Sequence, residues 1–219
     1  MCARFSLAEP ERLAGRYPQF TLRGGWPRRY NIAPTQDVLA VRNDGGGEAG
    51  TLRWGLVPPW ARDLAAGQTL INARAETLAE KPAFRGPLQR RRCVIFADGF
   101  YEWSGAKGKR QPYRFTVDDG APFAFAGLWE RWGSPDAPVD SCTIVTCTPN
   151  ALLAAIHDRM PVILDDGALD AWLYGPIGDA LGALVPYDAS RMRSAPVTPA
   201  MNHHAFDDPA CIEPLRLLL

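Results

Sequence analysis

The sequence predicts an α+β fold in which a single domain spans residues 1–219 and antiparallel or mixed sheet dominates. Short apolar segments with strand character recur along the chain, and several are joined by glycine-rich turns. Helical segments do not alternate regularly with these strands, which disfavours a doubly wound parallel sheet. Seven tryptophans and twenty prolines favour a loop-rich mixed fold over a helical bundle. No internal repeat or interdomain linker is visible.

Local signals place the expected elements along this domain. A hairpin is expected from residues 38–42 and 51–56 around a glycine-rich turn. Further strands are expected at residues 93–96, 113–117, 123–129, 142–146, 162–164 and 192–197. Helices are expected at residues 8–17, 148–156, 166–174 and 177–185, and a helical turn is expected to run through Glu80 and end near Pro82. Thr148 is expected to cap the helix at 148–156, with Pro149 in its first position.

Composition excludes several classes of protein. No apolar run approaches the ~20 residues that cross a bilayer, so no membrane association is expected. A formal net charge of zero argues against a protein that coats duplex DNA by bulk electrostatics. The five cysteines are irregularly spaced and form no disulfide framework, which indicates a cytoplasmic protein. Nothing in the sequence predicts a cofactor, and a monomer is expected.

A metal site is also rejected. His203 and His204, with Asp207 and Asp208, form the only weak cluster of metal ligands, and adjacent histidines point apart in regular structure. Cys142 and Cys147 lack a second pair at zinc-site spacing. We therefore expect the histidine pair to lie on the surface.

Cys2 directly follows the initiator methionine and is small enough for Met1 to be removed. Residue 2 would then carry an α-amine, with a pKa near ~7.8, and a thiol, with a pKa near ~8.5. Such a 1,2-aminothiol condenses with an aldehyde to an imine, and the thiol then closes a five-membered thiazolidine. From its position alone, Cys2 is more simply an incidental residue of a chain terminus.

Two other residues have the chemistry of an acid and a base. Glu102 lies among Phe100, Tyr101 and Trp103, where desolvation is expected to raise the pKa of its carboxyl group. His157 follows a predicted helix and has a pKa suited to proton transfer near neutrality. The simpler alternatives are a buried carboxylate satisfied by arginine or backbone donors, and a histidine that interacts with the helix dipole.

Two polar residues with possible roles at the site precede Glu102 in the chain. Asn72 and Arg74 are two residues apart, so on extended backbone they face the same side. Arg74 can bind phosphate in a bidentate manner, although an ion pair with Glu76 is the simpler reading. Three tryptophans are expected in the core, namely Trp54, Trp129 and Trp172. The run Arg90, Arg91 and Arg92 fits either a DNA-backbone contact or a solvated face.

Seven segments, taken in order, resemble the SRAP (SOS response-associated peptidase) family of abasic-site-processing proteins. They are Met-Cys-x-Arg-Phe at 1–5, Asn-Ile-Ala-Pro-Thr-Gln at 31–36, Trp-Gly-Leu-Val-Pro-Pro-Trp at 54–60, Asn-Ala-Arg-Ala-Glu-Thr at 72–77, Gly-Phe-Tyr-Glu-Trp at 99–103, Ala-Gly-Leu-Trp-Glu at 126–130 and His-Asp-Arg-Met-Pro-Val-Ile-Leu at 157–164. Each motif is weak by itself, but seven in this order are specific. The resemblance implies an SRAP-like domain with a barrel-like sheet core and flanking helices.

The resemblance also implies a function in the DNA damage response. Such proteins recognise an abasic site in single-stranded DNA and bond to it through the cysteine at position 2, forming a thiazolidine that shields the lesion. The implied catalytic residues are Cys2, Asn72, Glu102 and His157, of which Asn72 orients the amine or sugar while Glu102 and His157 transfer protons. The expected DNA-binding residues are Arg4, Pro34, Arg74, Phe84, Arg85 and Trp103. Pro34 and Trp103 resemble the family residues that wedge against bases beside the lesion, the arginines suit phosphate, and Phe84 with Arg85 is expected to line the same channel.

This chain departs from the family pattern at two places. The third position is usually glycine and is Ala3 here, which would cost about 1 kcal/mol if that position needs a positive φ. The tail after Pro196 also differs, and Val197 and Asn202 are the candidates there for the family's Val-Asn segment. Two other functions stay open: a cysteine-type (auto)peptidase built on Cys2, Glu102 and His157, and a non-covalent single-strand binding module.

Overall fold

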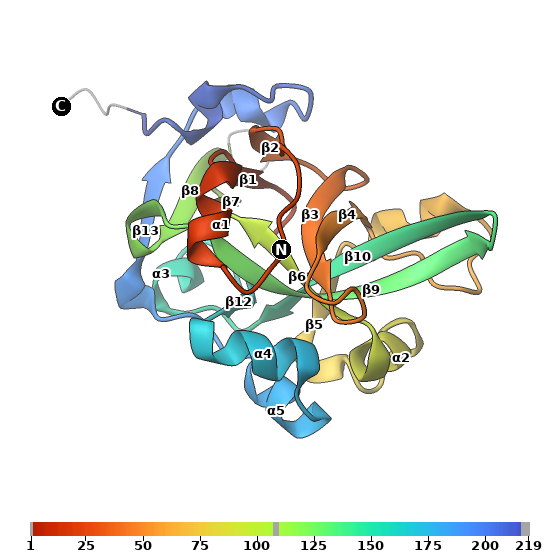
Figure 1. Ribbon diagram of the computed structural model, residues 1–219. Coiled ribbons are helices and arrows are strands. Elements are labelled where there is room, and N and C mark those ends of the chain that lie inside the picture. Colours follow the sequence, from red (N-terminus) through yellow and green to blue (C-terminus); the bar gives the residue numbers. More distant parts are fainter. Residues whose placement is uncertain (1, 107–109, 216–219) are drawn as a thin grey trace.

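Five strands close into a barrel at the centre of the molecule (Figure 1), whose computed structural model describes residues 2–106 and 110–215. The barrel strands are β3 (Asp37–Arg42), β4 (Ala49–Trp54), β6 (Arg92–Ala97), β9 (Phe123–Ser134) and β10 (Ala137–Cys147). Their order around the ring is β10-β4-β3-β6-β9, and β9 pairs with β10 again to close it. Within this ring β4 and β10 are parallel, with Ser141 opposite Arg53, and the other pairs are antiparallel.

Three short strands extend the barrel sheet. β5 (Asn72–Arg74) pairs in parallel with β10, β11 (Met160–Pro161) pairs with the end of β10, and β12 (Ile163–Leu164) pairs with β9. The β5 pairing sets Asn72 opposite Ile144 of β10. β5 and β11 therefore pair with the same end of β10 on its two opposite edges, because Thr146 faces both Arg74 and Pro161.

A second sheet of five strands carries the N-terminus, in the order β13-β8-β7-β1-β2. Its strands are β1 (Phe5–Leu7), β2 (Arg29–Ile32), β7 (Gly99–Ser104), β8 (Gln111–Val117) and β13 (Met192–Pro196). The N-terminal strand β1 lies between β2 and β7, with Phe5 opposite Phe100. The backbone N–H of Tyr101 donates to the carbonyl of Arg4 (3.0 Å), so the contact between β1 and β7 continues one residue further toward the N-terminus.

Aromatic side chains join the two sheets. Phe5 packs edge-on against Trp54 and Phe125 of the barrel, with ring centroids 5.1 and 5.7 Å apart. Trp54, Trp129 and Trp172 are all buried, as predicted. Because Phe5 is fully buried between the sheets, the residues just before it are held at their junction.

Five α-helices lie around this core: α1 (Leu13–Arg16), α2 (Pro82–Arg90), α3 (Ala151–Ala154), α4 (Asp166–Tyr174) and α5 (Ile177–Gly182), counted over residues 2–106 and 110–215. In Figure 1, α4 and α5 lie together at the lower end, and the chain after β13 runs back over β2 at the opposite end. Of the helices in the described parts of the chain, none is both long and apolar enough to cross a membrane.

The predicted fold class is confirmed: one domain of antiparallel and mixed sheet forms a five-stranded barrel with a few helices. Three element predictions were wrong. The expected helix at 8–17 is a 3-10 turn followed by the short α1. Pro82 does not end a helix but occupies the first turn of α2, where its missing N–H is not needed. Asn150, not Thr148, caps α3, because its Oδ1 accepts from the N–H of Leu153 (3.0 Å).

The predicted basic run at 90–92 is divided by the fold. Arg90 is exposed, whereas Arg92 at the start of β6 is only 5% exposed. The Arg92 guanidinium donates to the backbone carbonyls of Leu88, Trp172, Leu173 and Gly175, which lie near the ends of α2 and α4. Arg92 therefore neither contacts DNA nor lies on a solvated face, because its N–H donors bind buried backbone carbonyls.

Candidate active site at the N-terminus

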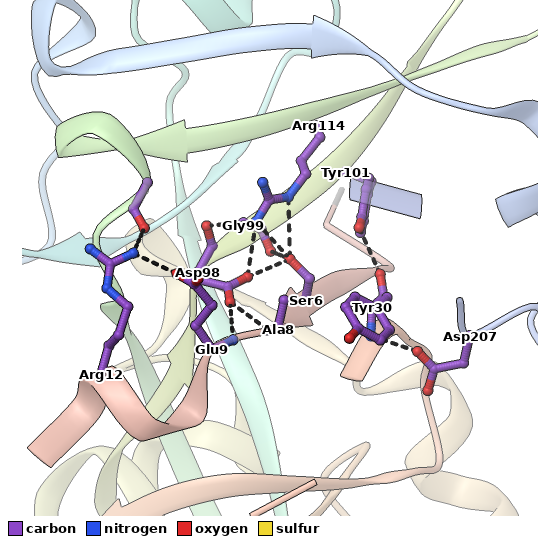
Figure 2. Close-up of polar contacts among 11 residues, drawn as sticks. Ser6, Ala8, Glu9, Arg12, Tyr30, Asp98, Gly99, Tyr101, Arg114 and Asp207 are labelled. Atoms are coloured by element: carbon purple, nitrogen blue, oxygen red, sulfur yellow. Dashed lines mark hydrogen bonds and ion pairs between the residues drawn. The ribbon is translucent and has the colours of Figure 1, made fainter. Parts of the chain in front are cut away.

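A buried carboxylate fixes the strand that carries the N-terminus (Figure 2). Asp98, which is 2% exposed, lies between β6 and β7 and accepts from Ser6 Oγ (2.7 Å), from the N–H groups of Ala8 and Glu9, and from Arg114 Nη2 (3.0 Å). A Cβ on the neighbouring Gly99 would lie 2.5 Å from Arg114 Nε, so a larger residue there would push the Arg114 side chain away from its place beside Asp98. Asp98 therefore ties β1 to β7 and β8, and the sequence analysis did not identify it.

Cys2 lies just before this strand and is fully buried. Its carbonyl oxygen accepts from Asn72 Nδ2 (2.9 Å), and its Sγ donates to the carbonyl of Arg4 (3.7 Å). Burial, followed by the nearby negative charge of Glu102, raises the pKa of the Cys2 thiol. The structure thus brings Cys2 and Asn72 together and keeps the sulfur protonated.

Asn72 retains an unused acceptor at the site. Its Oδ1 is buried and has no hydrogen-bond partner among the residues that the structure describes. Buried polar atoms of folded proteins are nearly always paired, so an unpaired acceptor marks a place where a ligand or a water binds. Asn72 can hold the Cys2 backbone through Nδ2 and accept from an amine or a hydroxyl group through Oδ1.

Glu102 is buried, as its aromatic neighbours in the sequence predict. It lies on β7, is 3% exposed, and burial raises the pKa of its carboxyl group to about 7. The predicted desolvation is confirmed. A carboxyl group with a pKa near the working pH can both give and take a proton, which is the property that general acid–base catalysis needs.

His157 follows α3, and its Nδ1 accepts from the backbone N–H of Arg159 (3.0 Å). Asp158 Oδ1 also lies 2.9 Å from the same nitrogen, a contact that favours the protonated ring. Burial lowers the pKa of His157, and Asp158 is largely exposed, so we take the neutral ring with its proton on Nε2 as the resting state. The ring can then donate through Nε2.

An ion pair secures the loop that carries His157. Arg159, 8% exposed, makes two bonds to the Glu76 carboxylate (2.7 and 2.8 Å) and donates to the carbonyl of Thr146 (2.6 Å). Glu76 therefore pairs with Arg159 rather than with Arg74, the partner that the sequence suggested. This pair joins the segment after β5 to the His157 loop.

Glu102 and His157 line one open pocket of about 470 Å³. The pocket is also lined by Ala3, Trp103 and Arg110, so the two predicted proton-transfer residues do meet at the N-terminus. Arg110, just before β8, was missed by the sequence analysis, because a single cation at the end of a hairpin loop carries no specific signal. Ala3 is not among the described non-glycine residues with positive φ, so the expected backbone cost does not arise.

The C-terminal segment contacts two of the predicted DNA-binding residues. Arg4 donates to Asn31 Oδ1 (2.8 Å) and to the carbonyl of Met201 (3.0 Å), and Trp103 Nε1 donates to Asn202 Oδ1 (2.7 Å). Asn202 therefore orients Trp103 in this chain. Arg4 joins β1 to the C-terminal segment, and phosphate binding by Arg4 stays a prediction.

Pro34 precedes a strained residue. Thr35 has a φ of 73°, a conformation that β-branched residues rarely adopt and that costs of order 1–3 kcal/mol. Its N–H donates to the carbonyl of Trp54 (2.8 Å), and its own carbonyl accepts from Arg53 Nη1 (2.5 Å). These bonds fix the turn that displays Pro34 at the surface of the barrel.

The remaining predicted DNA-binding residues differ in exposure. Arg74, at the end of β5, and Arg85, on α2, are exposed, as phosphate binding requires. Phe84 is 7% exposed and belongs to the hydrophobic core, so most of its ring is unavailable to a base. Trp60, 62% exposed in a proline-fixed loop, is an aromatic residue that the predicted set omitted. No group of three His, Cys, Asp or Glu within the described ranges is arranged to hold a metal ion.

Solved structures define the class of fold. A protein from Bacteroides thetaiotaomicron superposes with a TM-score of 0.87 over 98% of this chain and 100% of its own, at 24% identity. A protein from Bordetella bronchiseptica superposes with a TM-score of 0.78 at 34% identity, covering 90% of this chain and 100% of its own. The five-stranded barrel with a second sheet that carries the N-terminal strand is therefore an established architecture.

Sequence comparison then gives the family. The model of the SOS response associated peptidase (SRAP) family matches residues 1–204, and the chain belongs to this family. It is 44% identical to the abasic site processing protein YoqW of Bacillus subtilis (strain 168), over 97% of this chain and 99% of the relative. It is 30% identical to the abasic site processing protein HMCES of Gallus gallus, over 91% of this chain and 70% of the relative.

Proposed function

We propose that this protein processes abasic sites in single-stranded DNA by bonding to them through Cys2 after removal of Met1. The names of its relatives support the abasic site as substrate. The observation that supports the covalent step is that the side chains of Asn72, Glu102 and His157 lie close to the N-terminal segment. Asn72 holds the Cys2 carbonyl, Glu102 has a carboxyl pKa of about 7, and His157 shares a pocket with Glu102.

The chemistry balances without a cofactor. The open-chain sugar offers an aldehyde, which the Cys2 α-amine attacks to give a carbinolamine. Loss of one water yields an imine. The Cys2 sulfur then adds to the imine carbon, and its proton passes to the nitrogen, which closes the thiazolidine ring.

Glu102 and His157 serve the proton transfers. An abasic deoxyribose is mostly a closed hemiacetal, and opening it requires a proton at the ring oxygen and removal of one from the hydroxyl group. Glu102, half-ionised near pH 7, takes the hydroxyl proton and delivers it to the ring oxygen, while the neutral His157 ring donates a hydrogen bond to that oxygen through Nε2. Positioned acids and bases of this kind contribute roughly 10²–10⁴-fold in rate.

The order of the two bonds follows from the environment of the sulfur. Burial raises the pKa of the Cys2 thiol, so a free thiolate is scarce at neutral pH. The amine, created by removal of Met1, therefore reacts first, and the sulfur follows within the same residue. The same scarcity of thiolate disfavours the cysteine peptidase, which needs a thiolate nucleophile at the start.

The single strand would cross the exposed residues around the N-terminus. Arg74 and Arg85 offer guanidinium groups to the phosphates, and Pro34 and Trp103 offer flat surfaces to the bases beside the lesion. Trp103 is oriented for this by Asn202. We propose that a cytoplasmic monomer performs these contacts on DNA.

Intact mass before and after incubation with abasic single-stranded DNA tests the proposal. The wild-type protein is expected to lack Met1 and to gain the mass of the DNA less one water. Cys2→Ala abolishes this adduct, whereas Cys93→Ala, which removes a buried cysteine of the barrel, retains it.

Each alternative predicts a different result. Absence of an adduct with the processed wild-type protein, or an adduct that persists in Cys2→Ala, contradicts the proposal. Turnover of unrelated peptides that is lost in Cys2→Ser indicates a peptidase. Equal affinity for intact and abasic strands, unchanged by loss of Cys2, indicates a binding module.

A further inference from the structure

Arg110 differs in its contacts from Arg4 and Arg159, two other arginines near the candidate site. Arg4 and Arg159 are occupied by hydrogen bonds to Asn31, Glu76 and backbone carbonyls. Arg110 is exposed and makes no hydrogen bond or ion pair with any residue in the described ranges 2–106 and 110–215, yet it lines the same pocket as Glu102 and His157. Its guanidinium donors are therefore open to a ligand in that pocket.

The backbone beside Arg110 is fixed by the sheet. Gln111 begins β8 opposite Ser104 of β7, and Gln111 Nε2 donates to the carbonyls of Pro112 and Val197 (both 2.8 Å). Arg110 therefore leaves the sheet next to Ser104, which also lines the pocket. A cation on an anchored backbone loses less entropy on binding than one on a free loop.

The pocket suits an anionic group of modest size. Its volume of about 470 Å³ is within the range of ligand pockets, roughly 300–1,000 Å³. Its lining combines a guanidinium, a hydroxyl, an imidazole and the Trp103 ring beside one carboxyl group. Burial is the largest cause of the lowered pKa of His157, and the positive charge of Arg110 makes the smallest contribution to it.

We infer that Arg110 binds the phosphodiester directly beside the abasic sugar, in the pocket that it shares with Glu102 and His157. This inference rests on the proposed function and adds a residue to it. A guanidinium forms two parallel N–H···O bonds to a phosphate, which fixes both the position and the rotation of that phosphate. Holding the linkage next to the sugar brings the aldehyde carbon to the Cys2 amine in a defined orientation.

Binding of a short single strand that carries a tetrahydrofuran abasic analogue tests this contact without the covalent step. Arg110→Gln is expected to weaken binding about tenfold at low salt, the effect of losing one charged hydrogen-bond pair. It is also expected to reduce the slope of log K against log salt concentration by about 0.7, the value for one phosphate on a single strand. Arg193→Gln, an exposed arginine near the far end of the same sheet, should change neither quantity.

Replacing one phosphodiester by an uncharged methylphosphonate shows which phosphate Arg110 binds. A methylphosphonate placed on one side of the analogue should weaken binding to the wild-type protein and leave binding to Arg110→Gln unchanged, whereas a methylphosphonate several linkages away should weaken both equally. Arg110→Gln with the affinity and salt slope of Arg193→Gln would overturn the inference.

The two proposals fail separately. If wild-type protein and Arg110→Gln form the adduct with natural abasic DNA at the same rate and bind the analogue with the same affinity, the proposed function stands and the role of Arg110 is excluded. Lack of an adduct, together with weaker binding by Arg110→Gln, removes the covalent function and keeps the phosphate contact.

Discussion

Asp98→Asn tests whether one buried carboxylate organises the N-terminal strand. The substitution keeps the shape of the side chain and removes its charge. Arg114, with a side chain 15% exposed, then loses its ion-pair partner at 3.0 Å. At the same time, the new amide group must turn an N–H toward donors that now point at Asp98, namely Ser6 Oγ or the backbone N–H groups of Ala8 and Glu9.

The size of the effect follows from these contacts. Breaking a buried ion pair by removing one partner costs about 3–5 kcal/mol, a large part of the 5–15 kcal/mol that stabilises a typical domain. For a chain of this length each kcal/mol lowers Tm by about 2–4 °C, so a fall of about 6–20 °C is expected. Asp136→Asn, in the exposed turn between β9 and β10, should shift Tm by less than about 2 °C.

Thermal unfolding and adduct formation are measured on the same samples. Asp98→Asn should also form the abasic-site adduct more slowly at temperatures where it is still folded, because the strand that places Cys2 is loosened. A Tm equal to that of Asp136→Asn would refute the view that Asp98 anchors this strand.

Two further predictions concern the candidate site. Glu102→Gln should slow adduct formation by about 10²-fold or more near pH 7 while the protein stays folded. Because the folded pKa of Glu102, about 7, exceeds its unfolded value, the wild-type protein should lose stability as pH rises from about 4.5 to about 7, and the Gln variant should lack this loss. Asn72→Asp replaces the donor to the Cys2 carbonyl by an acceptor, so adduct formation should slow about tenfold or more.

Clear outcomes would contradict these two predictions. Rates of Glu102→Gln equal to the wild-type rates from pH 6 to 8 would exclude Glu102 from the proton transfers. An Asn72→Asp variant that forms the adduct at the wild-type rate would show that the amide bond to Cys2 has no part in the chemistry. Glu80→Gln, an exposed carboxyl outside the site, is the control for the first variant.

Local signals in the sequence predicted what depends on local chemistry. The aromatic neighbours of Glu102 predicted its desolvation, and the apolar setting of Trp54 and Trp172 predicted their burial. Helix starts were less predictable, because a proline such as Pro82 can follow one helical turn or begin the next helix, and Asn150 and Thr148 have similar capping propensity.

Contacts between distant segments could not be predicted. Arg4 bonds to Met201, 197 residues away, and Arg92 reaches carbonyls about 80 residues away. Both look in the sequence like cations available for phosphate. Asp98 likewise gains its importance only once β1 lies beside β7. The sequence predicts the chemical type of a side chain and its local backbone conformation. Whether its hydrogen-bond donors are free or bonded to a distant segment depends on the fold.

The parallel pair that closes the barrel has a consequence for the order of events during synthesis. β4 and β10 can pair only after more than 130 residues have been made, so the barrel closes late in translation. The N-terminus leaves the ribosome long before then. If Met1 is removed during synthesis, as the proposed function requires, the trimming peptidase meets it while Cys2 is still accessible, and folding then buries Cys2 with its amine already free.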